Sequence, residues 1–108
     1  MSKDYLRLEK DGVLYYKFYG KILDKNLNEV SQKKAKEISD ILFKGIKFDK
    51  FSKERLKDLV VELKSLGQIS RAIEACEVCF KRFGDDSKYI ESILPVYRSC
   101  CQIEQKDG

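Results

Sequence analysis

The alternation of apolar and polar positions changes its period once along this chain. Residues 5–20 place a strand-like alternation before a run of β-branched and aromatic residues, and the turn signal Asp11-Gly12 separates the two parts. Two such segments joined by a short turn are typical of a β-hairpin. We therefore expect a β-hairpin region over residues 1–24.

The same segment also fits an amphipathic helix. Leu14, Phe18 and Ile22 recur every four residues, which would place them on one face of a helix from Val13 to about Asp24. The hairpin is the favoured prediction, and the helix stays open as the alternative. In either form the segment must pack on the rest of the chain, because two strands alone are marginally stable in water.

After Asn28 the apolar positions follow the period of an α-helix in four successive stretches. Asn28, Ser52 and Ser70 are suitable capping residues at three of the starts, and Gly67 is a suitable end. The expected helices cover residues 29–46, 53–66, 70–83 and 87–103. The last helix contains Pro95, which lacks a backbone donor and is expected to kink or divide it.

The composition fits one small globular domain. The chain has 108 residues, of which 43% are apolar and 37% charged, and its net charge is only +4. No apolar run approaches the roughly 20 residues that cross a bilayer, and the N-terminus carries acid where a signal peptide carries an apolar stretch. We expect a single cytoplasmic domain over residues 1–108 with no membrane contact. The fold class is mainly α, with the β-hairpin at the N-terminus.

Positive charge and aromatic side chains are concentrated in the first half of the chain. Residues 1–52 hold twelve Lys or Arg against eight Asp or Glu, whereas residues 53–108 hold ten of each. A basic and aromatic segment can attract nucleic acid. Nucleic-acid binding through helix 29–46 and the nearby tyrosines is therefore the alternative function. The plainer explanation is a solvated, lysine-rich helix face.

A shift of 34 residues aligns the chain with itself. The shift places Ser65, Gln68 and Ile69 on identical residues, and it superimposes the apolar stripes of the second and fourth expected helices. This period is that of the tetratricopeptide repeat, a pair of antiparallel helices joined by a tight turn. Residues 53–103 resemble about one and a half such repeats in degenerate form.

The resemblance rests on particular positions. Leu66 and Gly67 take the place of the tight turn, and Ala72 takes the place of the small residue where the two helices cross. Two positions depart from the family pattern, since Leu63 replaces the usual tyrosine of the first helix and Gly84 replaces the usual proline after the second. The resemblance implies a short stack of antiparallel helical hairpins that binds a protein or peptide.

Repeats of this family bind their ligands on the concave face formed by their first helices. By resemblance, this face would present more basic than acidic side chains. Its candidate partner-binding residues are Lys57, Val61, Lys64, Lys88, Glu91 and Arg98. The charge balance indicates an acidic or mixed-charge peptide as the partner. The plainer explanation of the same residues is a solvated helix surface with paired charges.

Four aromatic residues crowd into the segment from Val13 to Tyr19. They cannot all face one core, whether the segment is a strand or a helix, so some are exposed or covered by a partner. Tyr15, Tyr16 and Tyr19 are therefore further candidate partner-binding residues. The alternative is that helices pack on both sides of the segment.

The sequence offers little support for catalysis or metal binding. The chain has no His, no Gly-rich phosphate loop and no conspicuous pair of carboxylates, so we expect no enzyme activity and no cofactor. Cys76 and Cys79 lie within an expected helix, and Cys100 and Cys101 are adjacent, an arrangement poorly suited to tetrahedral zinc. We expect reduced structural thiols, buried or half-buried, with one of the last two exposed.

These observations predict a non-enzymatic protein-binding module that acts as an adaptor, scaffold or inhibitor. The expected helix 87–103 matches the first helix of a repeat whose second helix is missing, so its apolar stripe lacks a partner. We therefore expect a homodimer or a place in a larger complex. The alternative is that the N-terminal hairpin folds back and covers this stripe.

Overall fold

A tight turn at Asp11 and Gly12 reverses the chain between the first two strands. In the computed structural model, which describes residues 5–107, both turn residues have positive φ angles of 54° and 81°. Two-residue hairpin turns favour such angles because they match the twist of the flanking strands. Strands β1 (Tyr5–Lys10) and β2 (Val13–Phe18) pair antiparallel on either side. The predicted hairpin is confirmed, and the helical alternative is wrong.

A third strand, which the sequence did not predict, extends the hairpin. Strand β3 (Lys21–Leu23) pairs antiparallel with β2, so the sheet has the order β1-β2-β3. Tyr19 lies in the connecting turn with a φ of 49°. After β3, the Asp24 carboxylate accepts hydrogen bonds from the backbone N–H groups of Asn26 and Asn28. Asn28 therefore belongs to this turn and does not cap the next helix.

Helices make up most of the remaining chain. They are α1 (Gln32–Phe43), the short 3-10 helix η1 (Phe48–Lys50), α2 (Lys53–Ser65), α3 (Ile69–Phe83) and α4 (Ser87–Asp107). A mainly α protein with an N-terminal antiparallel sheet is confirmed at this level. Within the described residues, no helix combines the length and the apolar composition needed to span a membrane.

The helix starts differ in detail from those expected. Ser52 caps α2 as predicted, with its hydroxyl accepting a backbone hydrogen bond. Ser31 caps α1 in place of Asn28. Helix α3 begins directly after Gln68, so Ser70 lies inside its first turn and is not the cap. Gln68 itself is buried, and its side chain hydrogen-bonds to Ser39 of α1. This contact fixes the backbone directly before α3, so the helix begins at Ile69.

Pro95 does not divide the last helix. Helix α4 is continuous from Ser87 to Asp107. Proline removes the hydrogen bond to the carbonyl of Glu91, and both residues lie on the exposed side of the helix. Water can therefore hydrate the freed carbonyl, and the cost of keeping the proline is small.

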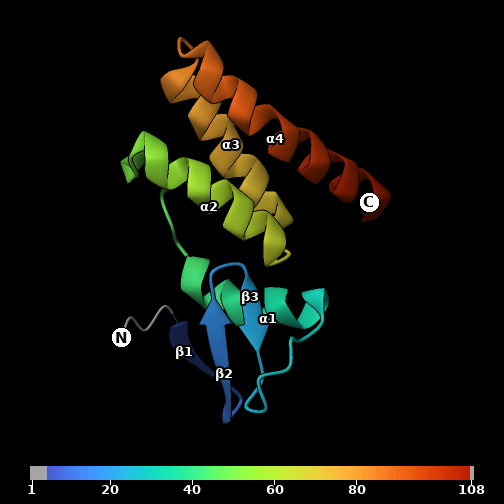
Figure 1. Cartoon of the computed structure of the whole chain (residues 1–108). Helices are drawn as coiled ribbons and strands as arrows, with labels where there is room; N and C mark the ends of the chain where they lie inside the picture. The colour runs from blue at the N-terminus through green and yellow to red at the C-terminus, as the bar shows by residue number, and fades with distance from the viewer. Residues whose placement is uncertain (1–4, 108) are drawn as a thin grey trace.

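The molecule has two halves that meet where α1 and the sheet approach the α2–α3 pair (Figure 1). In one half the sheet packs on α1, and in the other α2 and α3 form an antiparallel pair with α4 packed against both. Fully buried side chains run through both halves. Examples are Ile22, Ile38, Leu56, Leu63 and Ile93.

A partly buried hydrogen-bond network joins the two halves. The side-chain amide of Gln68 lies 2.9 Å from the Lys36 carbonyl oxygen, 2.9 Å from Ser39 Oγ and 2.8 Å from Asp40 Oδ1. Arg71 donates to Asp40 at 2.9 Å and also to the oxygen of the Gln68 side chain. A fully paired polar network specifies one arrangement of the elements that it joins. It fixes α1 against the turn between α2 and α3.

Candidate functional site

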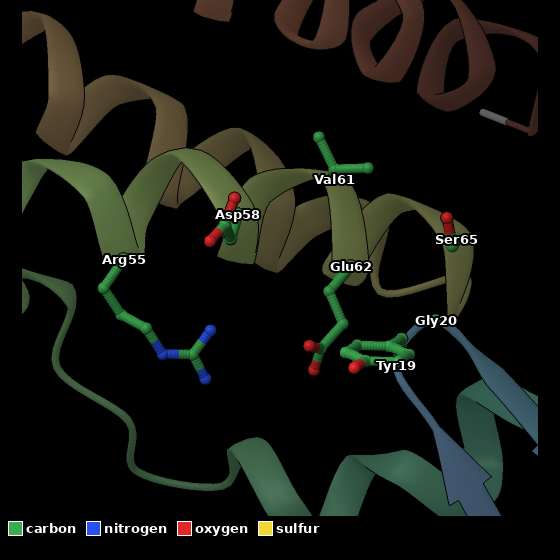
Figure 2. Close-up of a pocket in the computed structure, with 7 residues that line it drawn as sticks. All are labelled: Tyr19, Gly20, Arg55, Asp58, Val61, Glu62 and Ser65. Atoms are coloured by element: carbon green, nitrogen blue, oxygen red, sulfur yellow. The ribbon is translucent and has the colours of Figure 1, made fainter. Parts of the chain in front are cut away.

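A cleft of about 470 Å³ opens where the β2–β3 turn approaches α2. It is lined by Tyr19, Gly20, Arg55, Asp58, Val61, Glu62 and Ser65 (Figure 2). We name it the Tyr19 cleft. A neighbouring hollow of about 570 Å³ shares Tyr19, Gly20 and Ser65 with it, so the turn has open space beside it in two places.

Gly20 allows the turn to lie directly against α2. A Cβ atom at this position would be only 2.6 Å from Cβ of Ser65, a distance that real side chains do not tolerate. The neighbouring Tyr19 has a left-handed backbone, which is uncommon for a residue other than glycine. Its side chain is 69% exposed. The close packing therefore holds a strained aromatic residue out in solvent.

An ion pair fixes the wall of the cleft on the α2 side. Lys17 Nζ in β2 lies 3.0 Å from Oε2 of Glu62, and the two side chains are only 13% and 16% exposed. Figure 2 shows the Glu62 carboxylate beside the Tyr19 ring, with Arg55 reaching into the same space. Val61 projects from another side of α2 and is 51% exposed.

The cleft combines apolar surface with charges at its border. Tyr19 and Val61 supply exposed apolar area, whereas Arg55 and Asp58 supply one charge of each sign. The charge of Glu62 is already neutralised by its lysine partner. An exposed aromatic side chain bordered by polar groups is typical of protein-binding surfaces.

The predicted concave face lies on α2 and α4, which contact each other. Its exposed members are Lys57, Val61, Lys88, Glu91 and Arg98. Lys64, the remaining candidate, is half-buried. Val61 belongs both to this face and to the Tyr19 cleft, so the structure brings two separately predicted residues, Tyr19 and Val61, into one site. The sequence offered no signal for Arg55, Asp58 or Glu62 as members of it.

The three candidate tyrosines lie in different surroundings. Tyr15 is 8% exposed and belongs to the core, where it pairs across the strands with Leu8. It is therefore not available to a partner, which corrects its place among the candidates. Tyr16 faces the other side of the sheet and packs edge-to-face on Tyr5, with ring centroids 5.6 Å apart. Of the three tyrosines, Tyr16 is half-buried and Tyr19 is exposed.

The four thiols come from the facing helices α3 and α4. Cys76, Cys79 and Cys100 are buried and Cys101 is half-buried, and all four are free. Burial raises the pKa of Cys76 to about 12. A thiol with such a pKa is protonated at neutral pH and is a poor nucleophile and metal ligand. Within residues 5–107, no group of three or more cysteines and carboxylates is placed to hold a metal ion.

The lysine-rich helix α1 borders a separate hollow of about 630 Å³. It is lined by Lys10, Lys36, Glu37, Asp40, Ile41, Lys44 and Arg71. Asp40 pairs with Arg71 at 2.9 Å and with Lys36 at 3.6 Å. The hollow therefore has mixed charge, and two of its basic side chains already pair with Asp40. Nucleic-acid binding stays a prediction.

The apolar stripe of α4 is less exposed than the sequence indicated. Ile93 is fully buried, and Ile90, Leu94 and Tyr97 are half-buried. Tyr97 packs edge-to-face on Phe80 of α3, with ring centroids 5.0 Å apart. The hairpin does not fold back over the stripe, because the sheet lies at the other end of the molecule (Figure 1). Part of the stripe therefore remains accessible, and dimerisation through α4 stays a prediction.

The tetratricopeptide resemblance stays a prediction from residue positions, and α2 and α3 pack against each other as neighbouring helices. No protein-family model, no curated protein and no solved structure matches this chain.

Proposed function

We propose that this protein is a non-enzymatic protein-binding module and that the Tyr19 cleft holds its partner. The observation that carries the proposal is the 69% exposure of Tyr19 in a turn packed closely on α2. Exposed tyrosines on a fixed support are among the residues that contribute most to protein interfaces. Because the turn is already ordered, little conformational entropy is lost on binding.

The helical half supports the same proposal as a degenerate tetratricopeptide-like stack. Gly67 has a φ of 77° in the tight turn between α2 and α3, and Ala72 and Ala75 of α3 are fully buried. Helix α4 packs against both α2 and α3, as the first helix of a following repeat would. In such a stack α2 and α4 line the ligand face, and Val61 connects that face to the Tyr19 cleft.

The cleft suits a short peptide segment with an apolar anchor side chain. Tyr19 would contact the anchor, and Arg55 and Asp58 would pair with polar groups beside it. Val61, which projects from another side of α2 at the border of the cleft, would contact a neighbouring apolar side chain of the peptide. Farther along α2 and α4, the exposed basic candidates outnumber the acidic one. Acidic side chains of the partner would lie there. The protein acts as an adaptor, scaffold or inhibitor in the cytoplasm, where its four free thiols stay reduced.

A selection from displayed random peptides tests the proposal. Peptides enriched on the wild-type protein are measured again on Tyr19→Ala and Val61→Asp variants. Ile41→Ser is the matched control, because Ile41 is also 69% exposed but lies on α1, outside the cleft. We expect each cleft variant to weaken binding at least about tenfold and the control to leave it unchanged. Failure to enrich any peptide, or equal binding by all variants, would contradict the proposal.

A further inference from the structure

Strand β1 leaves one edge of the sheet open. The order β1-β2-β3 pairs β1 on one side only, and within residues 5–107 no strand lies on its other side (Figure 1). Along Tyr5–Lys10 the N–H and C=O groups of every second residue face β2, and those of the residues between point outward without strand partners. An open edge of this length can accept another strand.

Two opposite charges on β1 have no charged partner across the sheet. Arg7 lies opposite Tyr16, and Glu9 lies opposite Leu14. Both charged side chains are exposed, and neither takes part in an ion pair among the described residues. Because the two charges have opposite signs and stand two positions apart, a strand with the same sequence can pair with both of them.

We propose that the open edge of β1 binds a second copy of this chain. The strands run antiparallel, and the two Leu8 residues face each other at a two-fold axis. In this register Arg7 of each copy lies opposite Glu9 of the partner subunit, so two pairs of opposite charges form. A shift of the axis to Arg7 or to Glu9 would set like charges against each other. Among the registers centred on Arg7, Leu8 or Glu9, the one centred on Leu8 is therefore the one without like charges opposite each other.

The apolar side chains next to the edge support the same arrangement. Leu6 is 49% exposed and points to the same face of the sheet as Leu8. In the proposed register it lies opposite Lys10 of the partner subunit, whose aliphatic stem can cover it. Ile41 of α1 is 69% exposed and borders a hollow that Lys10 also lines. These apolar groups lie close to β1, the strand that would pair with the second copy.

The proposed dimer surface is separate from the Tyr19 cleft. Strand β1 forms one edge of the sheet, whereas the cleft lies at the turn before β3, the strand at the other edge. The dimer therefore leaves the Tyr19 cleft of each copy open. A test of the dimer is independent of a test of the peptide site. A pair of six-residue strands buries less area than a standard interface, so we expect a dissociation constant within the micromolar range, with dimer forming at its upper end.

Charge reversal combined with sedimentation equilibrium tests the register. Arg7→Glu sets two carboxylates opposite each other at both pairs, and Glu9→Arg sets two guanidinium groups there. We expect each variant alone to weaken the dimer at least about tenfold. An equimolar mixture of the two variants joins opposite charges at every pair, so it should form heterodimers with wild-type affinity. The double variant should also regain the homodimer.

Lys21→Glu is the matched control for Arg7→Glu, because it changes the net charge by the same amount but lies at an exposed position of β3. It should leave the dimer unchanged. Circular dichroism of each variant confirms that these exposed substitutions leave the fold intact. A wild-type monomer throughout the micromolar range would overturn the proposal. So would a dimer that ignores the charge reversals, or a mixture of the two single variants that stays monomeric.

Discussion

Lys17 of β2 and Glu62 of α2 form a 3.0 Å ion pair that is largely shielded from water, with the two side chains 13% and 16% exposed. The pair connects the sheet to α2 beside the Tyr19 cleft. Removal of either partner leaves the other charge in a place where water solvates it poorly. The pair therefore contributes both to stability and to the shape of the cleft.

Replacement of Lys17 by Met keeps the aliphatic stem and removes the charge. We expect Lys17→Met to lower the free energy of unfolding by about 1–3 kcal/mol, because Glu62 loses its partner. The double variant, Lys17→Met with Glu62→Leu, should lose less unfolding free energy than the two single variants lose together. Urea denaturation of the four proteins gives the coupling free energy. Costs that simply add would show that the ion pair has no energetic role.

The contact between Gly20 and Ser65 predicts a steric conflict. Gly20→Ala places a methyl group 2.6 Å from Cβ of Ser65, and we expect a loss of about 1–3 kcal/mol in unfolding free energy. Ser65→Gly in the same chain removes the opposing atom and should recover part of the loss. Ser70→Gly is the control and should recover nothing. Thermal unfolding measures all three, and absence of recovery at Ser65 would contradict the proposed contact.

Ala72 is fully buried in α3, so a larger side chain has no space there. We expect Ala72→Leu to cost about 1–3 kcal/mol through overpacking of the α2–α3 pair. Lys57→Ala, at an exposed position of α2, should change stability by less than about 0.5 kcal/mol. Urea denaturation compares them. Equal effects at the two positions would mean that the close packing of α3 does not depend on a small residue at this site.

The Gln68 network predicts a loss of stability at acid pH. Partial burial of Asp40 opposes its ionisation, but hydrogen bonds from Gln68 and Arg71 outweigh burial and lower the pKa of Asp40 below its ordinary value of 3.8. Ionised Asp40 therefore stabilises the fold above about pH 4, and this contribution is lost as the pH falls through the lower pKa of the folded state.

Asp40→Asn should reduce stability at neutral pH and flatten its decline below about pH 4. Urea denaturation at a series of pH values compares the variant with the wild type. Parallel curves for the two proteins would contradict the role of the ionised carboxylate. Glu37→Gln, at an exposed position on the same helix, is the control.

Local patterns were sufficient to predict the hairpin and the approximate ranges of the helices, because turns and apolar stripes depend on neighbouring residues. Strand β3 was missed since its three residues, Lys21–Leu23, are too few to show a period of their own. Its place depends on pairing with β2 and on a 3.0 Å hydrogen bond from the Val30 N–H to the Ile22 carbonyl. Such pairing is a tertiary property.

The candidate site was predictable only in part. The crowding of aromatic residues correctly indicated that some are exposed, but the sequence did not show which face of the strand meets the core. The structure settles this by burying Tyr15 and exposing Tyr19. The cleft itself depends on the approach of Gly20 to Ser65, two residues far apart in the chain. No local pattern contains that contact.

The most direct test of the central claim is a nuclear magnetic resonance titration of the isotope-labelled protein with a peptide selected on it. The account predicts that the largest changes in amide chemical shift fall at Gly20, Val61 and Ser65, which line the Tyr19 cleft. Amides of the α1 hollow, such as those of Lys36 and Lys44, should shift little. Largest changes around that hollow, with none at the cleft, would contradict the claim that the Tyr19 cleft binds the partner.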